Sequence, residues 1–320
     1  MLEEQAMITF LKKFDEHPFL VKINGHEHLI GEGAPTFTVN FKKVIPLKDL
    51  VTSTSLALGE AYMMVILILR ETFIRHLITF LGQMGKFSTD EHSFEIYHVP
   101  IFIKEKPEKK KVSSHYDIGN DFYKLWLDET MSYSCGYFKH EDDTLYQAQK
   151  NKVDYILEKL YLKEGMTLLD IGCGWGFLLI EAAKKYKIKG TGITLSEEQY
   201  KECQKRIKEE GLSDYLEVKL MDYRDLPSDG KMYDRVVSVG MLEHVGRENY
   251  QLYLDCVSKV MKDGGLFLLH FISALKEHPG DPWIKKYIFP GGSVPSLREV
   301  MNCMTEDNFH TQDIEDLRLH

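Results

Sequence analysis

The sequence has no apolar run long enough to cross a bilayer. Its most apolar stretch, residues 61–69, is far shorter than the ~20 residues that a membrane-spanning helix needs. We therefore expect any contact with a membrane to be made from its surface.

Paired cysteines and an excess of positive charge are missing as well. The five cysteines form no C-x-x-C pair, and no spacing of histidine and cysteine indicates a metal site. No secretory signal peptide is recognisable, so a reducing cytoplasm is the expected compartment. The net charge of −9 gives no general attraction to nucleic acid.

The length and composition are those of two ordinary globular domains. The 320 residues are 43% hydrophobic and 28% charged, which is enough apolar surface for two cores. Residues 104–112 are polar and contain a proline, which is typical of a linker, although their lysines would also suit anionic lipid headgroups. We expect a small α+β domain over residues 1–103 and a second domain over residues 113–320.

The first domain shows regular patterns but no obvious chemistry. Apolar residues fall on one face of a predicted helix over residues 2–15, which favours packing in a core over a lipid-surface helix. Short strands are predicted over residues 19–23, 36–41 and 64–69, and a helix over residues 72–81.

The second domain alternates strands with helices. Strands are predicted over residues 167–171, 188–193, 215–220, 234–239 and 266–269, and helices over 175–186, 197–210 and 248–260. Another helix begins at Thr144 with Gln147 in a capping box, and a turn is expected at residues 262–265. This alternation is typical of a parallel, doubly wound sheet.

A glycine-rich loop follows the first of these strands. Residues 168–176 read LLDIGCGWG, so Asp170 comes just before Gly172, Gly174 and Gly176. Glycines let a backbone approach a ligand closely, and the amides of the next helix point toward it. The spacing is one residue shorter than the G-x-G-x-x-G of nicotinamide-binding folds. It matches the D-x-G-x-G-x-G loop that holds S-adenosylmethionine (SAM) in Rossmann-like methyltransferases, although a glycine-rich turn without a ligand stays open as an interpretation.

Polar residues also follow the other predicted strands. In parallel sheets, ligands bind beyond the carboxyl ends of the strands, where such residues converge. The strand ends carry Asp170, Thr194, Asp222 with Tyr223 and Arg224, Glu243 with His244, and His270. Five such ends predict a binding site without reference to any family.

Several of these side chains also have a purely structural interpretation. Glu243 and His244 would serve as caps of the following helix, and His270 as a satisfied core histidine. Cys135 would simply pack, as most free cysteines do, and Cys173 is small enough for a tight loop. Near Glu243, however, His270 becomes half of an acid–base or anion-binding pair.

From about Ser113 onward the chain resembles the cyclopropane-fatty-acyl-phospholipid synthases, the family of the cyclopropane fatty acid and mycolic acid cyclopropane synthases. Matching segments follow in the family's order: HYDIGNDFY at 115–123, MSYSCGYF at 131–138, DIGCGWG at 170–176, GITLS at 192–196, MDYRDL at 221–226, SVGMLEHVG at 238–246, LLHFI at 268–272 and FPGG at 289–292. The resemblance implies an α/β fold class, a Rossmann-like doubly wound SAM-dependent methyltransferase domain with a small N-terminal α+β domain. It also implies transfer of a methylene from SAM to the cis double bond of an unsaturated phospholipid acyl chain, which forms a cyclopropane fatty acid.

Carried over position by position, the resemblance implies two sets of site residues. Contacts to SAM are implied for Tyr116, Tyr133, Ser134, Asp170, Gly172, Gly174, Thr194, Gln199, Asp222, Tyr223 and Arg224. A bicarbonate ion, which acts as the base, is implied to lie among Cys135, Glu243, His270 and the backbone of Ile272. The family's remaining bicarbonate ligand is a tyrosine beyond His320, so we expect the C-terminal end of the methyltransferase domain to be missing from this sequence.

The resemblance further implies a homodimer that is cytoplasmic and peripheral to the inner face of the cell membrane. Its implied partner is a phospholipid with unsaturated acyl chains, and no nucleic acid is expected. Residues 64–80 depart from the family's pattern. We interpret this stretch either as a local reading-frame shift in the gene or as an unusually apolar strand at a dimer or lipid contact.

Other functions stay open at this point. A SAM-dependent methyltransferase that modifies a small amine, or adds a methyl branch to a lipid, would share the scaffold. An inactive fragment would bind SAM without turnover. The set of Cys135, Glu243 and His270 favours ring closure. The glycine spacing and the lack of an acid after the second strand disfavour a nicotinamide dehydrogenase.

Overall fold

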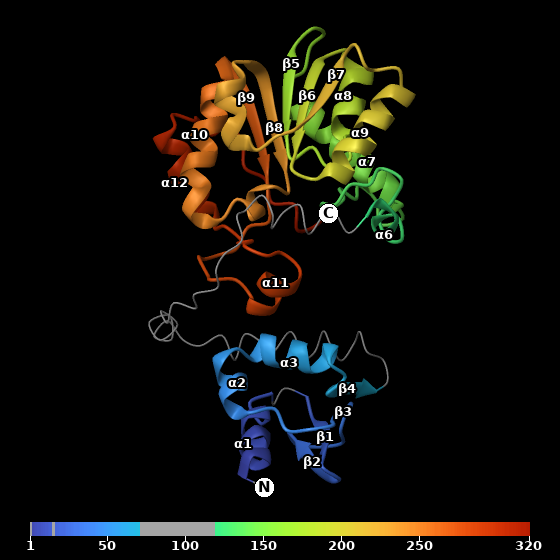
Figure 1. Ribbon diagram of the computed structural model, residues 1–320, viewed down its shortest axis with the longest axis vertical. Coiled ribbons are helices and arrows are strands. Elements are labelled where there is room, and N and C mark those ends of the chain that lie inside the picture. The colour runs from blue at the N-terminus through green and yellow to red at the C-terminus, as the bar shows by residue number, and fades with distance from the viewer. Residues whose placement is uncertain (1, 15–16, 71–118) are drawn as a thin grey trace. The chain divides into compact units, whose positions relative to one another are not determined.

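The computed structural model describes residues 2–14, 17–70 and 119–320 (Figure 1). The described residues form two compact units. The first comprises residues 2–14, 17–70 and 281–288, and the second comprises residues 119–280 and 289–320. The expected linker at 104–112 and the predicted helix at 72–81 lie outside the described residues.

The first unit combines a mixed sheet with helices. Its strands are β1 (Phe19–Ile23), β2 (His26–Ile30), β3 (Thr38–Phe41) and β4 (Leu67–Arg70), in the order β2-β1-β3-β4. Its helices are α1 (Leu2–Leu11), α2 (Leu47–Thr52), α3 (Thr54–Met63) and α11 (Pro282–Tyr287). β1 runs antiparallel to β2 and parallel to β3, as an α+β arrangement allows.

Helix α1 packs in the core of this unit because its apolar residues fall on one face. Met7 and Leu11 are buried in one cluster with Val21 of β1 and Val39 of β3. Each such side chain stabilises the fold by about 1.5–3 kcal/mol when it is fully buried. The packing helix is therefore the correct interpretation of this segment, and it ends at Leu11, earlier than predicted.

Helix α11 joins the first unit although it comes late in the chain. The Trp283 ring lies against Gly59 of α3, where an added Cβ would come within 2.6 Å of the indole nitrogen. The ammonium group of Lys286 and the hydroxyl of Tyr287 both donate to Oε1 of Glu60, at 2.5 and 2.7 Å. A division of the chain by sequence order alone does not anticipate this grouping.

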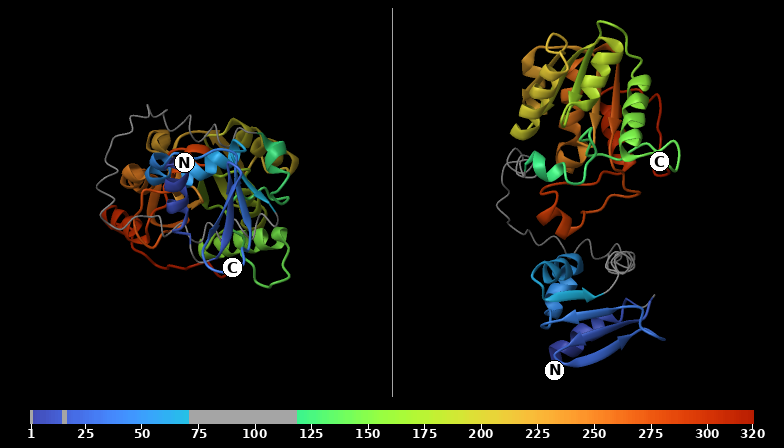
Figure 2. Two further views of the ribbon diagram at one scale, coloured as in Figure 1. Left: turned by 90° about the horizontal axis from the view of Figure 1, so that it is seen from below. Right: turned by 90° about the vertical axis from the view of Figure 1, so that its right-hand side faces the viewer.

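The second unit is a parallel five-stranded sheet with helices on both faces (Figures 1 and 2). Its strands are β5 (Thr167–Ile171), β6 (Lys189–Thr194), β7 (Leu216–Leu220), β8 (Tyr233–Val239) and β9 (Met261–His270), in the order β7-β6-β5-β8-β9. Its α-helices are α6 (Asn120–Tyr123), α7 (Leu145–Lys159), α8 (Phe177–Tyr186), α9 (Glu197–Glu209), α10 (Tyr250–Val260) and α12 (Leu297–Glu306). This arrangement confirms the predicted α/β, Rossmann-like and doubly wound fold class.

Neighbouring residues of the central strands pack into two separate cores. Leu168 of β5 belongs to a cluster that includes residues of α7, α8 and α9, whereas Leu169 belongs to a cluster with residues of α10. Val237 and Val236 of β8 divide between the same two clusters. Because side chains alternate along a strand, the two clusters lie on opposite faces, which explains why these strands are apolar throughout.

The main boundary difference in this unit concerns β9. Residues 262–265, predicted as a turn before a shorter strand, lie within β9. The ladder with β8 pairs Tyr233 with Met261 and resumes at Arg235 with Leu266. The intervening residues therefore form an irregularity in the strand, with Gly264 at a φ of 72°, instead of separating two elements.

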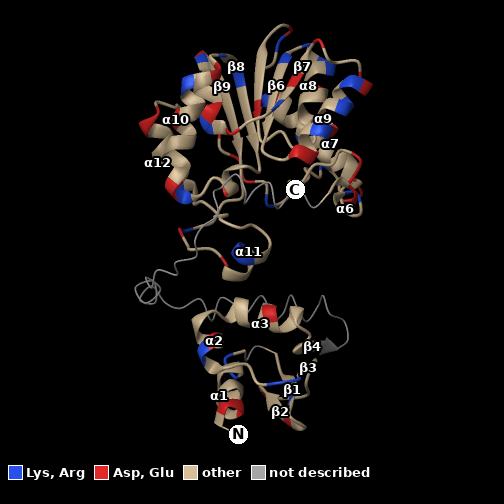
Figure 3. Ribbon diagram, in the orientation of Figure 1, with Lys and Arg blue, Asp and Glu red and all other residues tan. Residues whose placement is uncertain are grey.

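Within residues 2–14, 17–70 and 119–320, none of the helices combines the length and the apolar character that a bilayer-spanning segment requires. Both signs of charge mix along α9, where Lys201 lies near Glu197 and Glu198 (Figure 3). Such intermixed pairs differ from the basic stripe with which a helix follows a phosphate backbone.

Candidate active site

A cleft of about 150 Å³ lies at the carboxyl end of the parallel sheet in the second unit. It is lined by the ends of β5, β6 and β8, by residues that follow β7, and by the loop that precedes α7. Ten predicted cofactor-binding residues line it: Tyr133, Ser134, Asp170, Gly172, Gly174, Thr194, Gln199, Asp222, Tyr223 and Arg224. Tyr116, the remaining one, lies outside the described residues.

The glycine loop forms one wall of the cleft. The amides of Gly172 and Cys173 both donate to the carbonyl oxygen of Ile193, at 3.0 Å, which ties the loop to the end of β6. Gly172 has a φ of 79°, and a Cβ there would come within 2.9 Å of Met241. Gly174, with a φ of 54°, has no atom near its missing Cβ among the described residues. The loop is thus held on one side and open on the other, as a backbone that receives a ligand must be.

Asp170 lies at the end of β5, directly before this loop, and is 3% exposed. Burial raises the pKa of its carboxyl group from 3.8 to about 7. A cationic group bound in the cleft would favour the ionised form. A buried carboxyl group thus lies in the wall of the cleft, where it can pair with a positive charge.

At the end of β6, Thr194 and Gln199 form a buried hydrogen-bonded pair. The Thr194 hydroxyl donates to Oε1 of Gln199 at 2.7 Å and accepts from the Ser196 amide at 3.2 Å. The Ser196 hydroxyl accepts from the Gln199 amide at 3.3 Å, which caps α9 as predicted. The helix start therefore fixes the position of Gln199 in the cleft wall.

Beyond β7, an aspartate and an arginine hold one another. The guanidinium of Arg224 donates from Nε to Oδ1 and from Nη2 to Oδ2 of Asp222, at 2.9 and 2.7 Å. The Arg224 amide also donates to Oδ1 of Asp222 at 3.0 Å. Paired contacts of this kind give a planar, directional geometry, so the chain reversal after β7 is well defined next to the cleft.

The loop before α7 is anchored by two residues that the sequence analysis did not single out, Gln149 and Lys152. Lys152 donates to the Ser134 hydroxyl at 2.6 Å and to Oε1 of Gln149 at 2.5 Å. Gln149 donates in turn to the Ser134 carbonyl oxygen at 2.8 Å. Lys152 is 4% exposed, and burial lowers its pKa to about 8. Gln149 and Lys152 continue the buried face of the predicted helix by one turn toward its start. Polar residues on an otherwise apolar helix face are the sequence signal that indicates such buried contacts.

The four predicted catalytic residues form two contacting pairs at the ends of the neighbouring strands β8 and β9. Sγ of Cys135 lies 3.3 Å from Nε2 of His270, at the end of β9. The Ile272 amide donates to Oε1 of Glu243 at 2.6 Å. Burial, together with the positive charge of Lys152, lowers the pKa of His270 to about 4, so its imidazole is neutral near pH 7. Burial raises the pKa of Glu243, although the Ile272 amide acts in the opposite direction.

One polar atom in each of two side chains in this cluster lacks a partner. Oε2 of Glu243 and Nδ1 of His270 are buried and have no hydrogen-bond partner among the described residues. A buried polar atom without a partner costs about 1–3 kcal/mol. These two atoms therefore suit a small polar or anionic ligand that donates a hydrogen bond to Glu243 Oε2 and accepts one from His270 Nδ1.

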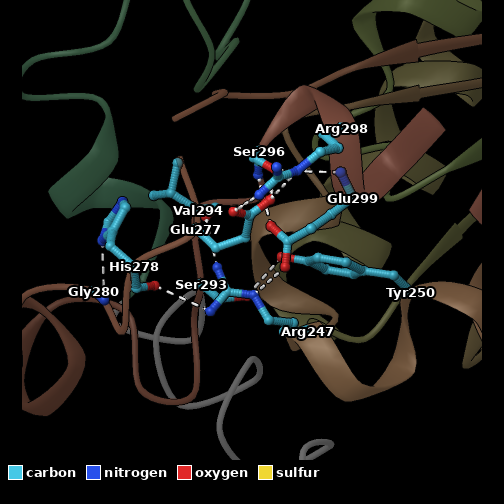
Figure 4. Close-up of polar contacts among 10 residues, drawn as sticks. All are labelled: Arg247, Tyr250, Glu277, His278, Gly280, Ser293, Val294, Ser296, Arg298 and Glu299. Carbon is cyan, nitrogen blue, oxygen red and sulfur yellow. Dashed lines mark hydrogen bonds and ion pairs between the residues drawn. The ribbon is translucent and has the colours of Figure 1, made fainter. Parts of the chain in front are cut away.

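The loop at residues 293–296 binds the backbone of Glu243 and belongs to a network of polar contacts around Arg247, which Figure 4 shows. The Ser293 amide donates to the Glu243 carbonyl oxygen at 2.8 Å, and the hydroxyls of Ser293 and Tyr250 lie 2.7 Å apart. Arg247 pairs with Glu299 at 2.5 Å and donates to the carbonyl oxygens of His278 and Val294, at 3.1 and 3.4 Å. This arginine thus connects both ends of the loop and the start of α12.

The alternative in which Glu243 and His244 cap the next long helix is wrong. Both residues lie in a short 3-10 turn, Leu242–His244. Another 3-10 turn, Arg247–Asn249, separates them from α10, whose N-cap is Asn249. The Glu243 side chain therefore does not cap α10, and it accepts the hydrogen bond of the Ile272 amide instead.

Comparison with known proteins gives a family for most of the chain. The family model of mycolic acid cyclopropane synthetase matches residues 103–320. The chain belongs to this family. Residues 6–88 match a second model, described as a domain of unknown function.

Three similar proteins illustrate the relationship. A cyclopropane-fatty-acyl-phospholipid synthase from Escherichia coli is 47% identical over 200 residues, which is 62% of this chain and 50% of that protein. A probable fatty acid methyltransferase from Pseudomonas putida is 45% identical over 223 residues, 68% of this chain and 56% of that protein. A mycolic acid cyclopropane synthase whose crystal structure contains SAH and CTAB is 34% identical in sequence to this chain. The two structures superpose with a TM-score of 0.62, and the match covers 68% of this chain and 80% of that one. The chain thus spans about half the length of the curated relatives that it matches.

Proposed function

We propose that this chain carries the SAM-dependent transfer of a methylene to the cis double bond of unsaturated phospholipid acyl chains, with bicarbonate as the base. The observation that carries the proposal is the pair of unpartnered atoms, Glu243 Oε2 and His270 Nδ1, beside a cleft bounded by a D-x-G-x-G-x-G loop. The names of the cyclopropane synthases that the chain resembles support the reaction type.

SAM is the proposed ligand of the cleft. Its sulfonium and ammonium charges suit Asp170, whose carboxyl group is ready to ionise near pH 7. We assign the ribose and adenine side to Thr194, Gln199 and Tyr223, and the methionine side to the glycine loop with Tyr133 and Ser134. The relative solved with SAH supports a SAM-type ligand in this fold.

Bicarbonate fits the residues of the proposed base site. The ion carries both a hydroxyl, which can donate to a carboxylate, and oxygens that accept from N–H groups. Glu243 offers a buried acceptor and His270 a ring nitrogen, and both atoms lack another partner among the described residues. The Ile272 amide and the Cys135 thiol complete the proposed set.

In the proposed reaction, SAM supplies an electrophilic methyl group, and one proton must then leave the transferred carbon for the ring to close. A weak base is sufficient because the positive charge left on the acyl chain makes that proton very acidic. Glu243 and His270 would orient this base, and the partial burial of their side chains limits the water that would compete for the cation. The neutral imidazole of His270 adds no charge that would repel the developing cation.

We further propose that the substrate is a phospholipid reached at the inner surface of the cell membrane, that the protein is a cytoplasmic homodimer, and that nucleic acid is no partner. The proposed domain limits are residues 1–103, 104–112 and 113–320.

The test is mass spectrometry of unsaturated phospholipid vesicles incubated with the chain, SAM and bicarbonate. The expected product is heavier by one CH₂ and has no reducible double bond. A product of the same mass that can still be hydrogenated would indicate a methyl or methylene branch instead. Calorimetric SAM binding without any lipid product would indicate a SAM-binding chain without turnover. Either of these results would refute the proposed reaction for this chain.

A further inference from the structure

Three side chains of metal-binding types meet in the first unit, whose described residues do not line the cleft. Glu4 lies on α1, and His26 and His28 lie on β2. Oε1 of Glu4 is 2.9 Å from Nδ1 of His26 and 3.2 Å from Nε2 of His28. The three ligand atoms all lie within 4.8 Å of one another, and they form the one such group in the described ranges.

The fold explains why these residues converge. His26 and His28 are two positions apart on a strand, so both rings leave the same face of β2. Helix α1 lies beside that face because Met7 and Leu11 are buried in the core of the unit. This packing holds the Glu4 side chain, which is 9% exposed, against the two rings.

The second oxygen of the carboxylate has a partner of its own. Nδ2 of Asn24, in the turn between β1 and β2, donates to Oε2 of Glu4 at 3.0 Å. Groups that bind a ligating carboxylate from behind fix its orientation and raise metal affinity. Oε1 is therefore directed to the point where the two imidazoles meet.

Two of the three distances are close to those expected around a small divalent cation, and the two ring nitrogens lie within 4.8 Å of one another. Zn²⁺ binds imidazole nitrogen and carboxylate oxygen at about 2.0–2.2 Å, so neighbouring ligands of a tetrahedral ion are roughly 3.3 Å apart. The two contacts of Oε1, at 2.9 and 3.2 Å, need to lengthen by only a few tenths of an ångström. The side chains of His26 and His28 are 63% and 34% exposed, which leaves an approach from solvent and a fourth position for water.

We propose that Glu4, His26 and His28 form a binding site for a borderline divalent cation, with Zn²⁺ as the representative ion. Two imidazoles and one carboxylate are a donor set that such ions prefer over Mg²⁺ or Ca²⁺. A bound ion would join α1 to the β1–β2 hairpin and so stabilise the first unit. The site is independent of the reaction proposed for the second unit.

The competing interpretation is a cluster held by hydrogen bonds alone. In that case the carboxylate would accept N–H groups from both rings and from Asn24, and added metal would change nothing. The two interpretations differ in their response to Co²⁺, which replaces Zn²⁺ in tetrahedral sites and reports its geometry by visible absorption.

The experiment uses the whole chain, stripped of metal with a chelator and then titrated with Co²⁺ and, separately, with Zn²⁺ by calorimetry. We expect one equivalent of metal to bind, a tetrahedral Co²⁺ absorption band, and a higher melting temperature with Zn²⁺. The double variant His26→Asn with His28→Asn should lose the band and that equivalent. Glu4→Gln, which keeps the shape of the side chain but removes its charge, should weaken binding at least tenfold.

The matched control replaces two exposed histidines outside this cluster, His140→Asn with His310→Asn, and should retain the band and the stoichiometry. Absence of a tetrahedral band in the unaltered chain would overturn the proposal. The same is true if the band and stoichiometry persist in the His26 and His28 variant. A His26 and His28 variant that melts at the same temperature as the stripped unaltered chain would support it, since the hydrogen bonds alone then contribute little.

Discussion

The backbone amide of Ile272 donates a 2.6 Å hydrogen bond to Oε1 of Glu243, across the gap between the end of β9 and the turn after β8. The bond fixes the carboxylate so that its other oxygen, Oε2, stays buried without a partner among the described residues. His270, two residues before Ile272, likewise keeps Nδ1 without a partner there. This short hydrogen bond thus joins the ends of β8 and β9, which carry the two side chains proposed to hold the base.

Replacing Glu243 by glutamine should separate binding from turnover. Oε1 of the amide can still accept from Ile272, but an NH₂ group takes the place of Oε2 and cannot accept the hydrogen bond with which the bicarbonate hydroxyl would be held, so the proposed base loses its position. Because acid–base assistance is worth roughly 10²–10⁴-fold, we expect cyclopropanation to fall by at least 100-fold. SAM affinity, measured by calorimetry, should change by less than about threefold.

The matched control for this variant is Glu248→Gln. Glu248 is exposed and lies in the next 3-10 turn, Arg247–Asn249. It should retain both turnover and SAM binding. Unchanged turnover in Glu243→Gln would remove this carboxylate from the mechanism.

Asp170 predicts how SAM affinity depends on pH. Its pKa is raised to about 7, so the carboxyl group is ionised above pH 7 and neutral below it. A neutral group cannot attract the positive charges of SAM, and affinity should therefore fall as the pH drops, by about tenfold between pH 8 and pH 6. Calorimetric titrations across this range test the prediction.

The variant Asp170→Asn has no group to titrate at this position. It should bind SAM weakly at every pH and show a flat profile. A profile as steep as that of the unaltered chain would show that another group controls the pH dependence.

Much of the second unit could be predicted from the sequence because its signals are local. The strands are apolar runs bounded by glycine or polar residues, and parallel order places their ends at one edge. Asp170, Thr194, Asp222, Glu243 and His270 follow directly from that rule. The resemblance to a family added Cys135 and Ile272, whose contacts with His270 and Glu243 no local pattern reveals.

The remaining contacts depend on packing between distant segments. The helical period places Lys152 on the buried face of α7, but it does not show that the loop around Ser134 covers this lysine and accepts its hydrogen bond. Glu4 and His28 become neighbours only once α1 covers the hairpin. Arg247 and Glu299 meet only because α12 returns to the turn after β8. Spacing along the chain carries no signal for such pairs.

Lys152 should be important for SAM binding although it is not expected to touch the reacting atoms. Lys152→Met keeps the length of the side chain but leaves the Ser134 hydroxyl and Oε1 of Gln149 without their donor. A hydrogen bond to a charged group contributes about 1.5–3 kcal/mol, so SAM affinity should fall by about tenfold or more. The loss of a nearby positive charge should also raise the pKa of His270, which NMR titration of the ring can detect.

Lys150→Met is the matched control, because Lys150 is on the same helix and only half-buried. It should leave SAM affinity and the His270 titration unchanged. Equal losses in both variants would point to a general weakening of α7 instead of a specific role for Lys152.

Arg247 should act on turnover through the position of Glu243. Arg247→Met removes the ion pair with Glu299 and two hydrogen bonds to loop carbonyl oxygens (Figure 4). It thereby releases the loop whose Ser293 amide binds the Glu243 backbone. We expect cyclopropanation to fall by about tenfold, in line with one lost charged hydrogen bond, while SAM affinity stays within about threefold. Arg247→Lys keeps the charge but lacks the planar guanidinium group with its several N–H donors. Its turnover should therefore lie between those of Arg247→Met and the unaltered chain.

The matched control for Arg247 is Arg298→Met. Arg298 is 74% exposed and pairs with Glu277 in the same network, but within the described part of the chain it does not bind the loop carbonyl oxygens that Arg247 holds. Exposed pairs contribute at most about 1 kcal/mol, so its turnover should be nearly unchanged. If Arg247→Met lowered SAM affinity and turnover by the same factor, the arginine would stabilise the unit as a whole, and the specific support of Glu243 would be refuted.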